Sequence, residues 1–254
     1  MIFKSFLMFA SRGTMAVPTF TLEVKSDNAG TSGTDQFTIP TTTGTYLYDY
    51  TTSDGQSGTG LTGATTITFA SGVGTYEIYI TGTFPKIFFN NVGDKLKLLR
   101  VLEWGDYGIG QTDQSRAFYD CSNLYSIASD VTNLNMTTLG ELMFFNCSLT
   151  SLPSGMTLPS LTNGLNMLRN TSLIDLPIGM TLPSLTNGSN ILLGVTINTT
   201  RYSQLLVDLE SGNANNSVAF HGGSSKYNAT GETARNILTG GVRLWTITDG
   251  GLEP

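Results

Sequence analysis

A tandem repeat in the middle of the chain constrains its fold more than any other feature. Residues 152–164 read LPSGMTLPSLTNG and residues 176–188 read LPIGMTLPSLTNG, so the copies begin 24 residues apart and differ only at Ser154 and Ile178. A repeat of about 20–29 residues typically forms a short strand and a return arc, and its apolar edge is buried only when units stack. The repeat therefore predicts a short solenoid.

The same register extends in both directions and gives about four units over residues 115–210. Recurrent asparagines, such as Asn163 and Asn187, are expected to form ladders between adjacent coils. We assign none of the repeated residues to catalysis, because repeated apolar side chains are expected to form the core. Equivalent apolar positions are Met143, Met167 and Ile191; Phe144, Leu168 and Leu192; and Leu149, Leu173 and Ile197.

The first unit resembles a known repeat family. Residues 117–127, AFYDCSNLYSI, are similar to the AFxxCxxLxxI signature of BspA-like leucine-rich repeats, and residues 144–153 are a looser copy. Later units depart from it, with Thr171 and Thr196 near the cysteine position. The resemblance covers about two fifths of the chain. It implies a leucine-rich-repeat fold and a role in adhesion or partner binding, on bacterial surfaces or in phage structural proteins.

Cys121 and Cys147 occupy equivalent places in successive repeats. Stacked neighbours can come close enough for a disulfide. The alternative, which we favour, is that both are small buried apolar residues. A zinc site needs about four ligands, and the chain has one His and two Cys, so we expect no metal site.

The residues before the repeats have a different pattern. Short alternating runs separated by Gly, Thr, Ser and Asp predict a small β-sandwich. Residues 48–55 (YDYTTSDG) and 68–78 (TFASGVGTYEI) resemble the PKD domain, an immunoglobulin-like module that acts as a spacer or docking unit. The motif's Trp is missing, and its His position holds Thr68 or a neighbour. The five predicted strands cover residues 20–24, 35–39, 46–50, 65–69 and 76–80.

The flanks of the repeats are expected to close the two ends of the solenoid. Trp104 is predicted to seal the first end, after strands over 87–89 and 98–102. Residues 201–210 have apolar side chains at helical spacing, and a second helix is predicted around 231–238. Residues 242–251 (VRLWTITDGG) resemble the closing strand of phage-encoded repeat proteins.

These patterns predict a mostly β chain: an immunoglobulin/PKD-like β-sandwich, a short leucine-rich-repeat solenoid and a small α/β C-terminal cap. The predicted divisions are an N-terminal arm over 1–16, the sandwich over 17–82, a linker and N-terminal solenoid cap over 83–114, repeats over 115–202 and a C-terminal cap over 203–254.

Composition excludes several classes of partner. The net charge is −6, only 13% of residues are charged, and Lys and Arg do not cluster, so nucleic-acid binding is not expected. No apolar run approaches the ~20 residues of a membrane span. The run over residues 6–10 is too short for a secretion signal. We expect residues 1–14 to be an uncleaved arm that packs on a partner, or a stretch upstream of a native start at Met15.

The sequence contains no constellation typical of an enzyme. Gly58-Thr-Gly60 and Gly72-Val-Gly74 lie in predicted turns and lead into no helix, so they do not fit nucleotide-binding loops. No pair of carboxylates stands out for glycoside hydrolysis. His221 is isolated from any Ser, Cys or carboxylate cluster in sequence. We therefore predict no catalytic residue and no cofactor.

The pattern favours a non-enzymatic phage structural protein exposed on the virion, as a decoration, head-fibre or tail-fibre component. It would occur in multiple copies, attach to other virion proteins through its N-terminal arm or sandwich, and contact host surface glycans or proteins through the repeats. The alternative is a BspA-like adhesin on a bacterial cell surface; a third is a polysaccharide-binding module that uses Trp104 or Trp245. The predicted binding surface consists of Tyr125, Ser126, Thr150, Ser151, Ile174 and Asp175.

Overall fold

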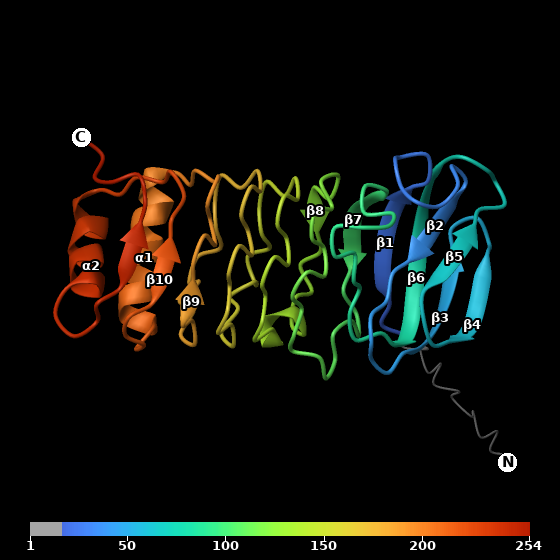
Figure 1. Ribbon diagram of the computed structural model, residues 1–254, viewed down its shortest axis with the longest axis horizontal. Helices are drawn as coiled ribbons and strands as arrows, with labels where there is room; N and C mark the ends of the chain where they lie inside the picture. The colour runs from blue at the N-terminus through green and yellow to red at the C-terminus, as the bar shows by residue number, and fades with distance from the viewer. Residues whose placement is uncertain (1–16) are drawn as a thin grey trace, which may run out of the picture.

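The computed structural model describes residues 17–254 of the chain as one elongated molecule (Figure 1). Two N-terminal sheets lie at one end, two helices lie at the other, and the repeats stack between them. The predicted arm over residues 1–16 lies outside the described residues.

The N-terminal end is built on a six-stranded sheet. Its strand order is β4-β3-β6-β1-β7-β8, in which all pairs are antiparallel except β7 and β8. Strands β2 (Gln36–Ile39) and β5 (Thr65–Thr68) pair separately. All five runs predicted for the sandwich contain strands, and so does the run over 98–102, but the strand predicted over 87–89 does not form. The six strands of the larger sheet are β1 (Phe20–Lys25), β3 (Leu47–Thr52), β4 (Ser57–Leu61), β6 (Thr75–Thr83), β7 (Leu98–Glu103) and β8 (Ser126–Ile127).

Aromatic side chains join the core of these sheets to the core of the repeats. Trp104 is fully buried, and its ring stacks on Phe20 at a centroid distance of 5.9 Å. It also meets Phe118 of the first repeat nearly edge-on at 5.8 Å. The Trp104 indole N–H donates to the Ala128 carbonyl at 3.2 Å. The predicted sealing residue therefore lies between two cores rather than at an open end.

The repeat backbone alternates between two kinds of hydrogen bond. In the second unit the amides of Leu142 and Phe144 donate to the carbonyls of Leu165 and Met167 in the next unit, each at 2.9–3.0 Å. The amides between them close local turns, as Met143 does with the Gly140 carbonyl at 3.1 Å. The first and third units repeat this alternation. This segment of each coil is therefore a row of turns bonded in register to the equivalent segment of the next coil.

Left-handed residues at fixed places make this alternation possible. The first column is Arg116, Leu142, Asn166 and Asn190, with φ values from 55° to 62°. The second is Asp120, Asn146, Asn170 and Gly194, with φ values from 57° to 83°. Asn, Asp and Gly adopt this conformation more readily than other residues, which explains why they recur there.

The prediction of a mostly β chain was wrong. The described residues form a mixed α/β structure with eleven strands in three sheets and two α-helices. Between residues 104 and 186 the regular elements are only β8 and the 3-10 helix η1 (Leu134–Met136), because left-handed residues prevent the extended strand expected of a leucine-rich-repeat solenoid. The prediction of an immunoglobulin/PKD-like sandwich was also wrong. The larger sheet is extended by β8, which belongs to the first repeat, and the sheet formed by β2 and β5 has only two strands.

Equivalent side chains form columns through the repeats. The rings of Phe118 and Phe144 stack at 5.3 Å with an interplanar angle of 11°, and Leu168 and Leu192 continue the buried column. Thr162 and Thr186 each donate a hydroxyl hydrogen bond to the carbonyl of the threonine one unit earlier, at 2.9 and 3.0 Å. The predicted asparagine ladder is present at Asn187, whose side-chain Nδ2 donates to Asn163 Oδ1 at 3.1 Å.

The C-terminal end covers the last repeat with a small sheet and two helices. Strands β9 (Asn187–Gly188), β10 (Ala219–His221) and β11 (Thr246–Thr248) are parallel. The predicted helices form as α1 (Thr199–Gly212) and α2 (Ala229–Thr239), capped by the side chains of Asn198 and Asn228. Neither helix in this described part of the chain is long and apolar enough to cross a membrane.

Replacement of Phe144 by alanine tests the repeat core. The Phe144→Ala variant removes a fully buried ring from the stack, so we expect it to lower the free energy of unfolding by about 3–5 kcal/mol. Urea unfolding followed by circular dichroism measures the loss, with Ile178→Ala as the exposed control. A loss below about 1 kcal/mol would contradict the stacked core.

Candidate binding surface

The six residues predicted to form a binding surface are all exposed and lie at equivalent positions of three repeats. They form three sequential pairs: Tyr125 with Ser126, Thr150 with Ser151, and Ile174 with Asp175. Each pair is flanked by two buried residues, which turn the pair outward. The pair Ile174 and Asp175, for example, lies between Leu173 and Leu176, which are 2% and 5% exposed. The other flanking pairs are Leu124 with Ile127 and Leu149 with Leu152.

Backbone hydrogen bonds set the spacing of these pairs. The Tyr125 amide donates to the Leu99 carbonyl of β7 at 3.1 Å, which fixes the first pair beside the N-terminal sheet. The Ile174 amide donates to the Thr150 carbonyl at 3.4 Å, and the Asn198 amide donates to the Ile174 carbonyl at 3.3 Å. The structure therefore brings the six residues into one row, hereafter the exposed row, which ends at the N-terminus of α1.

The end of the exposed row nearest α1 is apolar and flanked by two hollows. Ile174 is 69% exposed and Ile178 is 82% exposed. A hollow of about 240 Å³ includes Ser151, Asp175 and Ile178 in its lining, and one of about 410 Å³ includes Asp175, Ile178 and Gln204. Sequence reasoning missed Ile178 as a surface residue. The available signal was that Ile178 replaces Ser154 in an otherwise identical stretch of thirteen residues.

A buried arginine holds this end of the row in place. The Arg201 side chain is 8% exposed and donates to the Leu176 carbonyl at 2.7 Å and to the Pro177 carbonyl. Its Nε lies 3.9 Å from Asp175 Oδ1, and one terminal nitrogen lies 3.4 Å from Asp208 Oδ2. The Arg201 guanidinium is anchored to the backbone and lies near both Asp175 and Asp208, so the row ends in a rigid surface where one positive charge faces two carboxylates.

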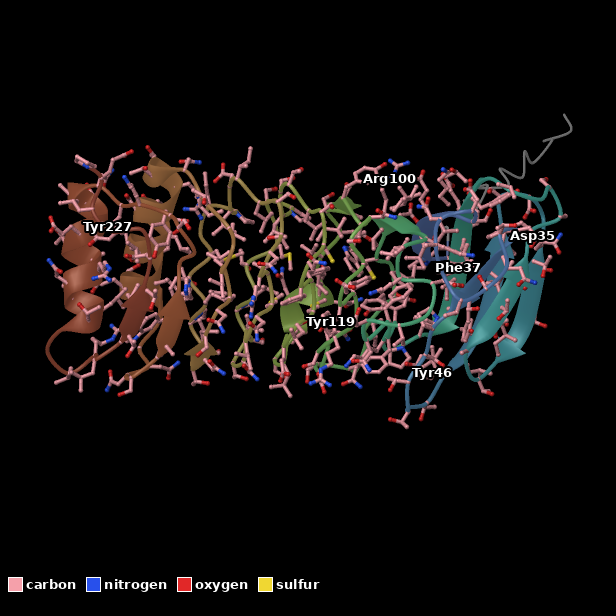
Figure 2. The ribbon with its side chains drawn as sticks, turned by 45° about the horizontal axis from the view of Figure 1, so that its top comes forward. Asp35, Phe37, Tyr46, Arg100, Tyr119 and Tyr227 are labelled. Atoms are coloured by element: carbon pink, nitrogen blue, oxygen red, sulfur yellow. The ribbon has the colours of Figure 1, made fainter. Side chains whose placement is uncertain are left out.

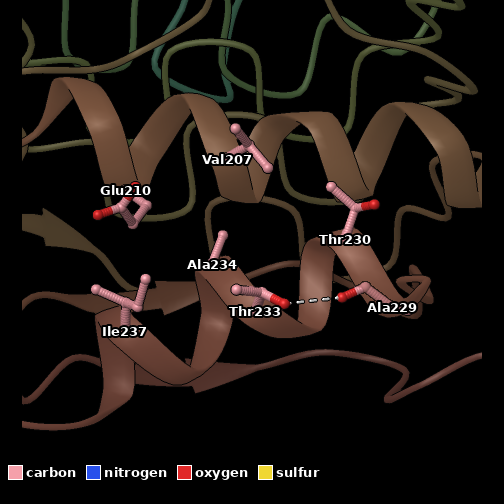
Figure 3. A pocket seen from close by; sticks show the side chains of 7 residues that line it. All are labelled: Val207, Glu210, Ala229, Thr230, Thr233, Ala234 and Ile237. Carbon is pink, nitrogen blue, oxygen red and sulfur yellow. Dashed lines mark hydrogen bonds between the residues drawn. The ribbon is translucent and has the colours of Figure 1, made fainter.

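A further hollow of about 420 Å³ lies between α1 and α2 (Figure 3). Val207 and Glu210 line it from α1, and Ala229, Thr230, Thr233, Ala234 and Ile237 line it from the second helix and its start. Glu210 is its one charged group, and the Thr233 hydroxyl donates to the Ala229 carbonyl at 3.2 Å. The lining therefore pairs no nucleophile with a base.

Cys121 and Cys147 are both free thiols, so the disulfide alternative is wrong. Both are buried, and Cys147 Sγ donates to the Phe118 carbonyl at 3.3 Å. Burial raises the pKa of each thiol well above its ordinary value. Because the thiolate is the reactive form, these cysteines contribute packing rather than reactivity.

His221 belongs to the polar surroundings of the C-terminal sheet. Its Nδ1 accepts a hydrogen bond from the Gly223 amide at 3.0 Å, and burial lowers its pKa. The nearby Asp249 carboxylate is already occupied, since it accepts from Arg235 at 2.8 Å and from the Tyr202 hydroxyl at 3.1 Å. This cluster joins α1, α2 and the end of β11. Within residues 17–254 no group of three or more His, Cys, Asp or Glu side chains is placed to hold a metal ion.

Comparison with known protein families, curated proteins and solved structures found no match to this chain.

Proposed function

We propose that this chain is a non-enzymatic structural protein on the surface of a phage particle, as a decoration, head-fibre or tail-fibre component. In this proposal it contacts its partner through the exposed row. The observation that carries the proposal is the apolar end of that row, where Ile174 and Ile178 expose most of their side chains and Ile178 lines two hollows.

Energetics favour a contact at this end of the row. Burial of one isoleucine side chain stabilises a complex by about 1.5–3 kcal/mol. The backbone beneath the row is bonded unit to unit, so binding would order few groups and would keep most of that gain. Exposed apolar groups rimmed by polar ones are typical of interaction sites. The rim here consists of Ser151, Asp175 and Gln204.

The continuous aromatic core supports a role in display. Because Trp104 packs on both Phe20 and Phe118, the exposed row is held at a fixed distance from the N-terminal sheets. Attachment of the N-terminal end to other virion proteins would then present every copy of the row in the same orientation. The partners in this proposal are virion proteins at that end and host surface glycans or proteins at the row.

The proposal predicts that the chain is a component of purified particles. Mass spectrometry and immunogold labelling of virions, produced from the genome that encodes the chain, should detect it in multiple copies on the outside. Absence from purified virions would contradict the proposal. Detection on intact bacterial cells, with residues 1–14 removed, would instead support the alternative of a cell-surface adhesin.

A double variant tests the exposed row itself. Ile174→Ser with Ile178→Ser removes the apolar contact, so we expect adsorption of particles to host cells to fall at least tenfold. The free energy of unfolding should change by less than about 1 kcal/mol, since both side chains are exposed. Ile109→Ser with Val242→Ser, 59% and 78% exposed elsewhere, is the matched control. Unchanged adsorption of the Ile174/Ile178 variant would refute the role of the row.

A further inference from the structure

A polar groove lies where the N-terminal sheets meet the first repeats, away from the exposed row. Its volume is about 490 Å³, and nine of its eleven lining residues are polar. Charged groups of both signs face it, from Lys86, Asp113, Arg116 and Glu141, and Phe88 supplies an aromatic ring. This lining is suited to a ligand that both donates and accepts hydrogen bonds.

The floor of the groove follows the repeat stack. Asp113, Leu139 and Asn163 occupy equivalent positions of successive units and are joined by parallel bridges. The groove therefore runs across consecutive coils and presents side chains at the regular spacing of the stack. Such a floor fits an extended ligand better than a compact one.

The wall of the groove is fixed from both sides. The Tyr46 hydroxyl donates to the Lys86 carbonyl at 2.7 Å, and the Gln114 side chain donates to the Pro85 carbonyl at 3.1 Å. The Phe88 amide donates to the Pro40 carbonyl at 3.3 Å. Figure 2 places Tyr46 near the junction between the N-terminal sheets and the repeats. The wall is thus formed before any ligand arrives, which lowers the entropic cost of binding.

Lys86 places an ammonium in the wall of the groove. The residue is 6% exposed, its nitrogen lies 3.6 Å from Asp113 Oδ1 and 5.1 Å from the centre of the Phe88 ring. Among residues 17–254 no acceptor lies within hydrogen-bonding distance of it. Burial lowers the pKa of Lys86, and Asp113 opposes that shift. An ammonium has three hydrogens to donate, and Lys86 lines the groove, so its hydrogens are open to an acceptor on a ligand.

The charge balance of the groove selects among acceptors. Arg116 is paired with Glu141 at 3.2 Å, and Asp113 offsets Lys86, so the groove is neutral in a chain whose net charge is −6. An anionic ligand would meet Asp113 and Glu141 at close range. A hydroxyl group can instead accept from Lys86 while it donates to Asp113, and two adjacent hydroxyls can do so together.

From this geometry we infer that the groove binds a neutral saccharide. Lys86 and Asp113 bind neighbouring hydroxyls of one sugar ring, the Phe88 ring contacts its C–H face, and Asn163 contacts the next residue along the floor. This site differs from the exposed row and does not depend on a role in a virion.

A glycan array with the full chain tests this inference. The biotinylated protein is presented on streptavidin, so that several copies bind together and weak sites become measurable. The array carries neutral, sialylated and sulfated oligosaccharides, and the strongest neutral ligand is then titrated by calorimetry. We expect neutral oligosaccharides to bind, and Lys86→Met and Asp113→Asn each to weaken binding at least tenfold.

Matched variants separate this site from the rest of the molecule. Lys226→Met replaces an exposed lysine, and Val242→Ser alters a side chain that is 78% exposed and lies outside both proposed sites, so both should bind the saccharide as the unchanged protein does. Thermal unfolding of Lys86→Met and Asp113→Asn verifies that both remain folded. The inference is overturned if no neutral glycan binds, if anionic glycans bind best, or if both folded variants keep full affinity.

Discussion

The alternation of turn-closing and coil-bridging hydrogen bonds is the interaction on which the rest of the structure depends. Because alternate amides in one segment of each repeat, such as Leu142 and Phe144, bond the next unit, these segments can stack in only one register. That register places Phe144 over Phe118 and aligns the threonine hydroxyls with the carbonyls of the preceding unit. Nearly all polar groups of a buried backbone must be paired, and here the stack itself pairs them. Packing and hydrogen bonding therefore specify the same arrangement.

The two ends of the stack follow from the same requirement. At the first end, the amides of Phe89 and Asn91 donate to the carbonyls of Ala117 and Tyr119, so the segment after β6 completes the first coil. At the other end, the Leu192 amide donates to the His221 carbonyl of β10. The exposed row and the polar groove are two columns of one repeating geometry. The bonds that stabilise the stack thus also space the side chains that we propose contact ligands.

The sequence predicted the period, the buried positions, both helices and the places of the exposed row, because each depends on spacing along the chain. It did not predict the backbone conformation of the repeats, since an apolar period of this length suits a strand as well as a row of turns. Arg116 and Leu142 adopt left-handed conformations that their side chains do not favour, so only the stack explains them. Strand β4 was missed because Gly58 and Gly60 weaken its pattern. The groove was missed because Lys86, Asp113 and Asn163 lie far apart in sequence.

The most direct test of this account is nuclear magnetic resonance detection of couplings across hydrogen bonds in the deuterated protein. The account predicts couplings from the Phe144 amide nitrogen to the Met167 carbonyl carbon and from the Leu168 amide to that of Ile191. It predicts turn couplings from Met143 to Gly140 and from Met167 to Gly164. Couplings of Met143 or Met167 to carbonyls of a preceding repeat, as extended parallel strands would give, would contradict the alternating pattern.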